Sequence, residues 1–400
     1  MRVSAAIRLA ALALAGGALA ASAGCGTRAL TANASGGGGT GVIGFDAGPG
    51  ATFRPTRDVD LLFMIDNTSG TSLLQNNLLR NFPSFTEALS SLSGGFLPNL
   101  HIAVVTSDMG AGDGSIASCA ADGGDAGIFQ STARGTCTST NLDPGATFIS
   151  DVDGVKNYTG NINDVFTCIA SVGNSGCGFE QPLASVARAL GADGRPPPAE
   201  NQGFLRQDAL LFIVLLMNED DCSVPPGSAL FDTTSNVDLA SQLGPVTNFR
   251  CNEFGHQCNG AKPPRLAPTG SVNDVVTLDG CVSAEGAGML TPLATLRAQI
   301  RSLKPFPDQQ ILVAAIAAPS APYTIEWRNP SIADTGPWPV IDHSCTGSDG
   351  SFAAPAVRIN EFAAGFGANG QTSTVCVDTF GPILSSLAVQ LAAHIPVLQQ

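Results

Sequence analysis

The segment that most constrains the fold spans residues 58–69 and reads DVDLLFMIDNTS. An apolar run, Val59 to Ile65, ends in the polar triplet Asp66-Asn67-Thr68, and an amphipathic segment from Leu73 to Leu92 follows. This order predicts a buried strand, a polar corner and then a helix. It places the carboxylate of Asp66 at the C-terminal end of a strand, which is where open α/β sheets bind their ligands.

Further apolar runs follow at Leu100–Thr106, Ala209–Met217 and Gln310–Ala317. They are continuous rather than alternating, as is typical of strands covered on both faces. Helical patterns lie between and after them, at Ile162–Val172, Gln181–Leu190, Pro292–Leu303, Ala356–Phe366 and Pro382–Leu398. Alternating strands and helices predict a doubly wound α/β fold with a mainly parallel sheet. Right-handed crossovers would bring the C-terminal ends of its strands to one edge.

Three long segments between these elements are read as insertions, at about 107–160, 219–291 and 318–355. They are called the first, second and third insertions below. Each begins where a predicted strand ends, so we expect all three on the same edge of the sheet as Asp66. The predicted organisation is a signal peptide at 1–24, a Gly-rich flexible tether at 25–57 and an α/β domain at 58–398.

The N-terminal residues have the features of an export signal. Arg2 and Arg8 give a positive start, and the apolar run Leu9–Ala21 is too short to span a membrane. Ala23-Gly24-Cys25 resembles a bacterial lipoprotein box, which implies lipidation of Cys25 and anchoring to the cell envelope, with the outer membrane expected. The alternative is ordinary cleavage after Ala21-Ser22-Ala23, which would give a secreted protein.

The cysteines agree with an exported chain. Of the 11 cysteines, those other than Cys25 form an even set, which predicts disulfides in an oxidising compartment. Local pairs Cys119–Cys137, Cys168–Cys177 and Cys345–Cys376 are suggested by proximity, although the connectivity stays open. The remaining four are expected to pair among themselves: Cys222, Cys251, Cys258 and Cys281.

The net charge of −14 argues against nucleic acid as a partner and against electrostatic attachment to anionic lipid. It is compatible with divalent cations. The sequence has no Gly-x-Ser-x-Gly elbow, no phosphate-binding loop ending in Gly-Lys-Ser/Thr, no His-Glu-x-x-His and no dinucleotide fingerprint. We therefore predict a protein that is not an enzyme.

The corner after the first strand resembles that of the von Willebrand factor type A family, in which Asp-x-Ser-x-Ser holds a divalent cation. Asp66 matches the Asp and Thr68 stands for the first Ser, but Gly70 occupies the second Ser position. A one-residue slip would offer Ser69 and Thr71 instead. The resemblance covers roughly residues 58 to 395 and implies that Mg²⁺ or Ca²⁺ binds here. The alternative is a corner in which Asp66 or Thr68 caps the helix.

The same resemblance implies ligands from two other loops. Asn218, at the end of the third apolar run, sits where the family has an Asp, and Glu180 lies where a Thr is expected. Independently of the resemblance, the run Glu219-Asp220-Asp221 would repel itself without a cation, which favours Glu219 and Asp220 as ligands. The alternative is a solvated loop start whose Asp220 or Asp221 bonds to local backbone N–H groups.

These features predict a cell-envelope binding or adhesion module that recognises a protein or surface ligand at the C-terminal edge of the sheet, with a divalent cation. One alternative is a metal-free scaffold of the same fold that binds through its insertions. Another is a cell-wall or glycan hydrolase using Glu180 and Asp220, which would need to lie roughly 5 to 9 Å apart.

Overall fold

The computed structural model describes residues 51–112, 116, 119, 123–135, 137–234, 238–329 and 337–396. The predicted signal peptide, Cys25 and most of the predicted tether lie outside these residues.

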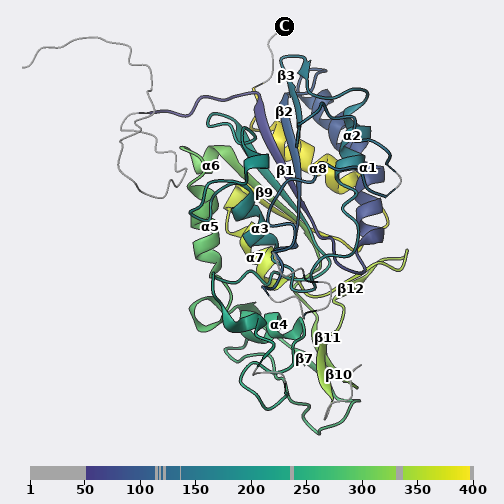
Figure 1. Ribbon diagram of the computed structural model, residues 1–400, viewed down its shortest axis with the longest axis vertical. Coiled ribbons are helices and arrows are strands. Elements are labelled where there is room, and N and C mark those ends of the chain that lie inside the picture. Colours follow the sequence, from purple (N-terminus) through teal and green to yellow (C-terminus); the bar gives the residue numbers. More distant parts are fainter. Residues whose placement is uncertain are drawn as a thin grey trace, which may run out of the picture. The chain divides into compact units, whose positions relative to one another are not determined.

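A central sheet organises the described chain (Figure 1). It is seven-stranded, with the order β14-β9-β5-β1-β2-β3-β4. The strands from β14 to β2 run parallel, and β3 and β4 add antiparallel at one edge. The strand bounds are β1 Asp58–Ile65, β2 Asn99–Thr106, β3 Ile149–Val152, β4 Val155–Lys156, β5 Leu210–Leu216, β9 Ile311–Ala317 and β14 Gly370–Thr374.

Helices cover both faces of this sheet. Alternate residues of β1 point to opposite faces: Phe63 and Ile65 join one apolar core, and Leu62 and Met64 join another. Residues of α1, α2 and α8 complete the first core, and residues of α3, α5 and α7 complete the second (Figure 1). The helix bounds are α1 Ser72–Leu92, α2 Ile162–Ile169, α3 Pro182–Ala189, α5 Leu293–Arg301, α6 Pro307–Gln310, α7 Val357–Ala364 and α8 Gly381–Ala392.

The predicted mixed α/β architecture with a mainly parallel sheet is confirmed. Each predicted apolar strand and each predicted helix is present, with ends shifted by a few residues. Strand β14 was not predicted, because its sequence GQTST has no apolar run and it lies at the sheet edge. The antiparallel pair β3–β4 was also missed, within the first insertion.

The strand order reverses at β1. The chain passes from β1 to its neighbour β2 and then returns to β5 on the other side of β1. Strands β1 and β5 pair in parallel, and the backbone N–H of Asp66 donates to the carbonyl of Leu216 at 3.0 Å. The expected adjacency of these two strand ends is therefore confirmed, and a switch point of this kind leaves a crevice for ligands.

The second and third insertions form a small substructure beyond that edge (Figure 1). Strand β10 pairs with β7 from the second insertion and with β11 from the third. Buried Tyr323, Ile325 and Trp327 on β10 pack with Phe249 on α4. The bounds are α4 Phe249–Gly255, β6 His256–Cys258, β7 Val275–Leu278, β8 Cys281–Ser283, β10 Tyr323–Arg328, β11 Trp338–Ile341, β12 Cys345–Thr346 and β13 Phe352–Ala353, with 3₁₀ turns in the chain at Ala199–Asn201, Ala229–Phe231, Glu285–Ala287 and Gly367–Asn369.

Five disulfides cross-link the described residues. The suggested pairs Cys119–Cys137 and Cys168–Cys177 are wrong, because the first insertion folds back onto later segments and pairs Cys119 with Cys177 and Cys137 with Cys168. The other predictions are confirmed: the second insertion pairs within itself, as Cys222–Cys251 and Cys258–Cys281, and Cys345 pairs with Cys376.

A buried arginine on α7 ties the second insertion to the domain. The guanidinium of Arg358 donates to Asp221 Oδ2 at 2.9 and 3.1 Å, to Ser283 Oγ at 2.7 Å and to the carbonyl of Thr291 at 2.7 Å. Arg358 and Asp221 are each 1% exposed. Removing one member of such a pair leaves an uncompensated buried charge.

We therefore expect Arg358→Met to lower the free energy of unfolding by about 3–5 kcal/mol, measured by urea denaturation. The control is Arg328→Met, which removes an exposed guanidinium paired with half-buried Glu326 on β10 and should cost less than about 1 kcal/mol. The double variant Asp221→Asn/Arg358→Met should recover part of the loss. Equal effects of the two single Arg variants would contradict this assignment.

Candidate functional site

The corner after β1 holds a buried carboxylate that is already hydrogen-bonded. Asp66 Oδ1 accepts from the backbone N–H of Thr68 at 3.0 Å and from Ser107 Oγ at 2.8 Å, and Oδ2 accepts from Thr68 Oγ at 3.1 Å. Burial raises the pKa of Asp66, and these hydrogen bonds oppose that shift. The alternative in which Asp66 or Thr68 caps the helix is wrong, because the N-cap residue of α1 is Thr71.

Gly70 has a different role from the one that the resemblance implied. A Cβ at this position would lie 3.3 Å from Phe352 Cζ and 3.5 Å from Asn218 Nδ2, and the backbone φ of Gly70 is +94°. A side chain here would therefore be strained and crowded. Gly70 makes room for a ring from the third insertion, which covers the corner.

The acidic run after β5 does not converge on one point. Glu219 Oε2 accepts a hydrogen bond from Asn248 Nδ2 at 2.8 Å. Asp220 turns to the start of α7, where it accepts from the backbone N–H groups of Arg358 and Ile359 at 2.8 and 3.0 Å. Asp221 forms the buried ion pair described above. Repulsion within the run is thus relieved by separation and by basic or N–H partners.

Asp220 also begins a buried polar chain. Its Oδ2 lies 2.8 Å from His256 Nε2, His256 Nδ1 lies 2.8 Å from the Tyr323 hydroxyl, and that hydroxyl donates to Asn252 Oδ1 at 3.0 Å. Burial raises the pKa of Asp220, but the bond and charge of His256 and the two α7 N–H groups outweigh it, so the pKa is lowered. The alternative prediction, that Asp220 or Asp221 bonds to local backbone N–H groups, holds for one contact. The backbone N–H of Asp221 donates to Asp220 Oδ1 at 2.9 Å.

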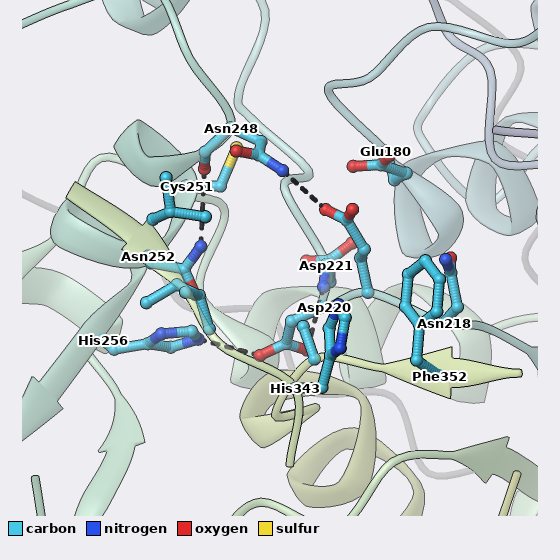
Figure 2. A pocket seen from close by; sticks show the side chains of 14 residues that line it. Glu180, Asn218, Asp220, Asp221, Asn248, Cys251, Asn252, His256, His343 and Phe352 are labelled. Carbon is cyan, nitrogen blue, oxygen red and sulfur yellow. Dashed lines mark hydrogen bonds and ion pairs between the residues drawn. The ribbon is translucent and has the colours of Figure 1, made fainter. Parts of the chain in front are cut away.

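A cavity of about 140 Å³ lies between the end of β5, α4 and the third insertion (Figure 2). Of the predicted site residues it brings together Asn218, Glu219 and Asp220, whereas Asp66 and Thr68 are not among its lining residues. Glu180 joins them from the loop before α3. The remaining lining residues are Asp221, Asn248, Cys251, Asn252, His256, Val340, Ile341, His343, Phe352 and Ala354.

Two carboxyl groups in this cavity have strongly shifted pKa values. Burial raises the pKa of Glu180 well above its usual range, and the charges of Glu219 and Asp66 add to the shift. Burial raises the pKa of Glu219 to about 7, with the Asn248 hydrogen bond opposing and the Asp66 charge adding. Within the described residues, no basic side chain forms an ion pair with either group. The cavity thus holds two carboxyl groups whose burial favours the protonated form and which have no basic partner among the described residues.

Asn218 contributes a buried acceptor without a partner. Its side chain is 2% exposed, and Oδ1 has no hydrogen bond in the part of the chain that the structure describes. The His343 and Phe352 rings stack nearby, with centroids 4.1 Å apart and an interplanar angle of 18°. Figure 2 shows these side chains on the same side of the cavity. Buried polar atoms are usually hydrogen-bonded, so this carbonyl is a candidate for contact with a ligand.

Sequence reasoning missed Asn248, His256, His343, Phe352 and Arg358 as parts of this region. All lie in or beyond the insertions and carry no motif that links them to β5. Across the described ranges, no three His, Cys, Asp or Glu side chains are grouped so that they could hold a metal ion. The same residues include no helix that is long and apolar enough to cross a membrane.

No protein-family model and no curated protein matches this sequence. Solved structures with some similarity are bacterial pilins and adhesins. A point mutant of the PilB minor pilin from Streptococcus sanguinis has a TM-score of 0.28 at 10% identity, over 86% of this chain and 62% of that one. The adhesive tip pilin GBS104 from Group B Streptococcus agalactiae has a TM-score of 0.28 at 11% identity, over 84% and 62%.

The pilus adhesin RrgA from Streptococcus pneumoniae has a TM-score of 0.23 at 11% identity, over 65% of this chain and 39% of that one. The chain therefore spans less than two thirds of the length of each of these proteins. TM-scores this low do not establish a shared fold.

The predicted membership of the von Willebrand factor type A family is wrong. No family model matches the chain, and the described residues lack a grouping of carboxylates that could hold the family's cation. Here Asp66 and Thr68 bond to each other and to Ser107, and Phe352 occupies the space beside Gly70.

The raised pKa of Glu219 predicts a pH-dependent stability. A carboxyl whose pKa is higher in the folded state stabilises the fold below its unfolded pKa of about 4.5, and this contribution is lost as pH rises through about 7. We expect Glu219→Gln to flatten the fall in unfolding free energy between about pH 5 and 7.5, measured by urea denaturation.

Burial lowers the pKa of His101, so this residue makes the unfolding free energy rise with pH, opposite to Glu219. The informative quantity is therefore the difference in unfolding free energy between the wild type and Glu219→Gln at each pH. The matched control is Glu326→Gln, which makes the same change at a half-buried position on β10 outside the cavity. An unchanged slope in Glu219→Gln would refute the assignment.

Proposed function

We propose that this protein is a non-catalytic binding module of the cell envelope and that the cavity beyond the C-terminal end of β5 is its ligand site. The observation that carries the proposal is the unpartnered Asn218 carbonyl beside two uncompensated carboxyl groups, Glu180 and Glu219. A concave site with a few convergent polar groups is the usual form of a ligand pocket. Its position beyond the carboxyl end of a parallel strand agrees with the general rule for such sheets.

The partners of the lining residues support recognition rather than chemistry. Both oxygens of Asp220 accept hydrogen bonds, from His256 and from the first turn of α7, so Asp220 is not free to serve as the acid or base of a hydrolase. His256 is likewise held between Asp220 and Tyr323. Cys251 is in a disulfide with Cys222 and is not a nucleophile.

Export is supported by the cross-links. Five disulfides among the described residues suit an oxidising compartment. Lipidation at Cys25 remains part of the proposal, and so does a surface or protein ligand. Mg²⁺ or Ca²⁺ as a component of the site also remains a prediction.

Binding can be tested by co-sedimentation of the purified full chain with envelope fragments of the source organism. We expect saturable binding by the wild type and at least about tenfold weaker binding by Glu219→Lys, because the reversed charge would lie in the site. The control Glu326→Lys makes the same change at a half-buried position on β10 outside the cavity. Equal binding by both variants, or no saturable binding by the wild type, would overturn the proposal.

The anchor can be tested by mass spectrometry of the mature N-terminus. We expect a chain that begins at Cys25 and carries acyl groups. A mature protein that begins at Gly24 without lipid would contradict the lipoprotein prediction and favour secretion.

A further inference from the structure

We infer that the cavity receives the guanidinium group of an arginine side chain from a partner polypeptide. This inference rests on the proposed function and names the chemistry of its ligand. Three features carry it: free acceptors that follow β5, two buried carboxyl groups without a basic partner among the described residues, and a flat aromatic wall.

The free acceptors belong to two side chains that follow the end of β5. Asn218 Oδ1 has no partner, and Glu219 uses Oε2 for Asn248, which leaves Oε1 without a hydrogen bond among the described residues. Glu180, which is 3% exposed, adds a second carboxyl group at the same cavity. A ligand that only donates hydrogen bonds fits such a set, and guanidinium offers several N–H donors and no acceptor.

The charge of the site also favours an organic cation over a metal ion. The carboxyl groups of Glu180 and Glu219 repel each other and have no basic partner in the described part of the chain. Mg²⁺ requires about six oxygens close to one point, and no such grouping of carboxylates is present in the described residues. A guanidinium spreads its charge over a planar group, so it can reach acceptors that are set apart.

The aromatic wall distinguishes guanidinium from ammonium. Phe352 and His343 stack nearly parallel and both line the cavity, and His343 is exposed at its rim (Figure 2). A guanidinium plane stacks on such a ring while its edge donates to carboxylates. The lysine ammonium is a compact, strongly hydrated charge that would use neither the flat wall nor the separated acceptors.

The test uses the full chain with 4-fluorophenylalanine at position 352 and follows the ¹⁹F shift as peptide is added. The probe is acetyl-Gly-Arg-Gly-amide. Its first control is the citrulline peptide, which has nearly the same shape without the charge, and its second is the lysine peptide. We expect saturable binding of the arginine peptide, and binding at least about tenfold weaker for both controls.

Two variants connect the binding to the proposed residues. Glu219→Gln should weaken binding of the arginine peptide about tenfold, and Asn218→Asp should strengthen it, because it places a charge where the free carbonyl lies. Glu326→Gln, at a half-buried position on β10 that does not line the cavity, should leave the affinity unchanged. Thermal unfolding of each variant verifies that it folds, and Glu219→Gln keeps the test decisive if Asn218→Asp does not fold.

Several outcomes would overturn the inference. They are equal affinity for the arginine and citrulline peptides, equal affinity for the lysine peptide, and an unchanged affinity in Glu219→Gln. A Ca²⁺ or Mg²⁺ titration that saturates below millimolar concentration and is lost in Glu219→Gln would assign the cavity to a metal ion instead. If the peptide fails to bind while co-sedimentation still depends on Glu219, the ligand class is wrong and the proposed function stands.

Discussion

Parallel pairing between β1 and β5 is the interaction on which the site depends. The two strands are buried on both faces and share a continuous register from Val59–Leu210 to Ile65–Leu216. Because a one-residue slip would turn every apolar side chain to the other face, this register is strongly fixed. It sets the corner at Asp66 beside the loop that starts at Met217, and the insertions are then built around that fixed edge.

The carboxyl groups buried at this edge of the sheet fall into two sets. Some have partners that stabilise the fold, and others are available to bind a ligand. Asp66 is bonded by Thr68 and Ser107, Asp220 by His256 and the start of α7, and Asp221 by Arg358. These groups lock the insertions onto the sheet, since each would be costly to leave unpaired. Glu180 and Glu219 have no such basic partner among the described residues, and their raised pKa values show that their neutral polar contacts do not offset the cost of burying a charge.

The insertions provide the walls of the cavity, whereas the sheet provides its floor. Helix α4 contributes Asn252, the residue before it is Asn248, and the third insertion contributes His343 and Phe352. The disulfide Cys222–Cys251 fixes α4 to the end of β5, and the small sheet β7–β10–β11 joins the two insertions. A common scaffold carrying a site built by its loops is the usual relation between fold and function in α/β proteins.

The sequence by itself determined the strand and helix pattern, because continuous apolar runs and helical periodicity depend only on neighbouring residues. It also predicted that Asn218, Glu219 and Asp220 lie at the C-terminal edge of the sheet, because parallel strands place their C-terminal ends together. Only the tertiary structure decided the disulfide partners and the packing of Phe352 against Gly70. It also decided that Glu219, Asp220 and Asp221 bond to different partners. Those depend on contacts between residues far apart along the chain, for which no local pattern exists.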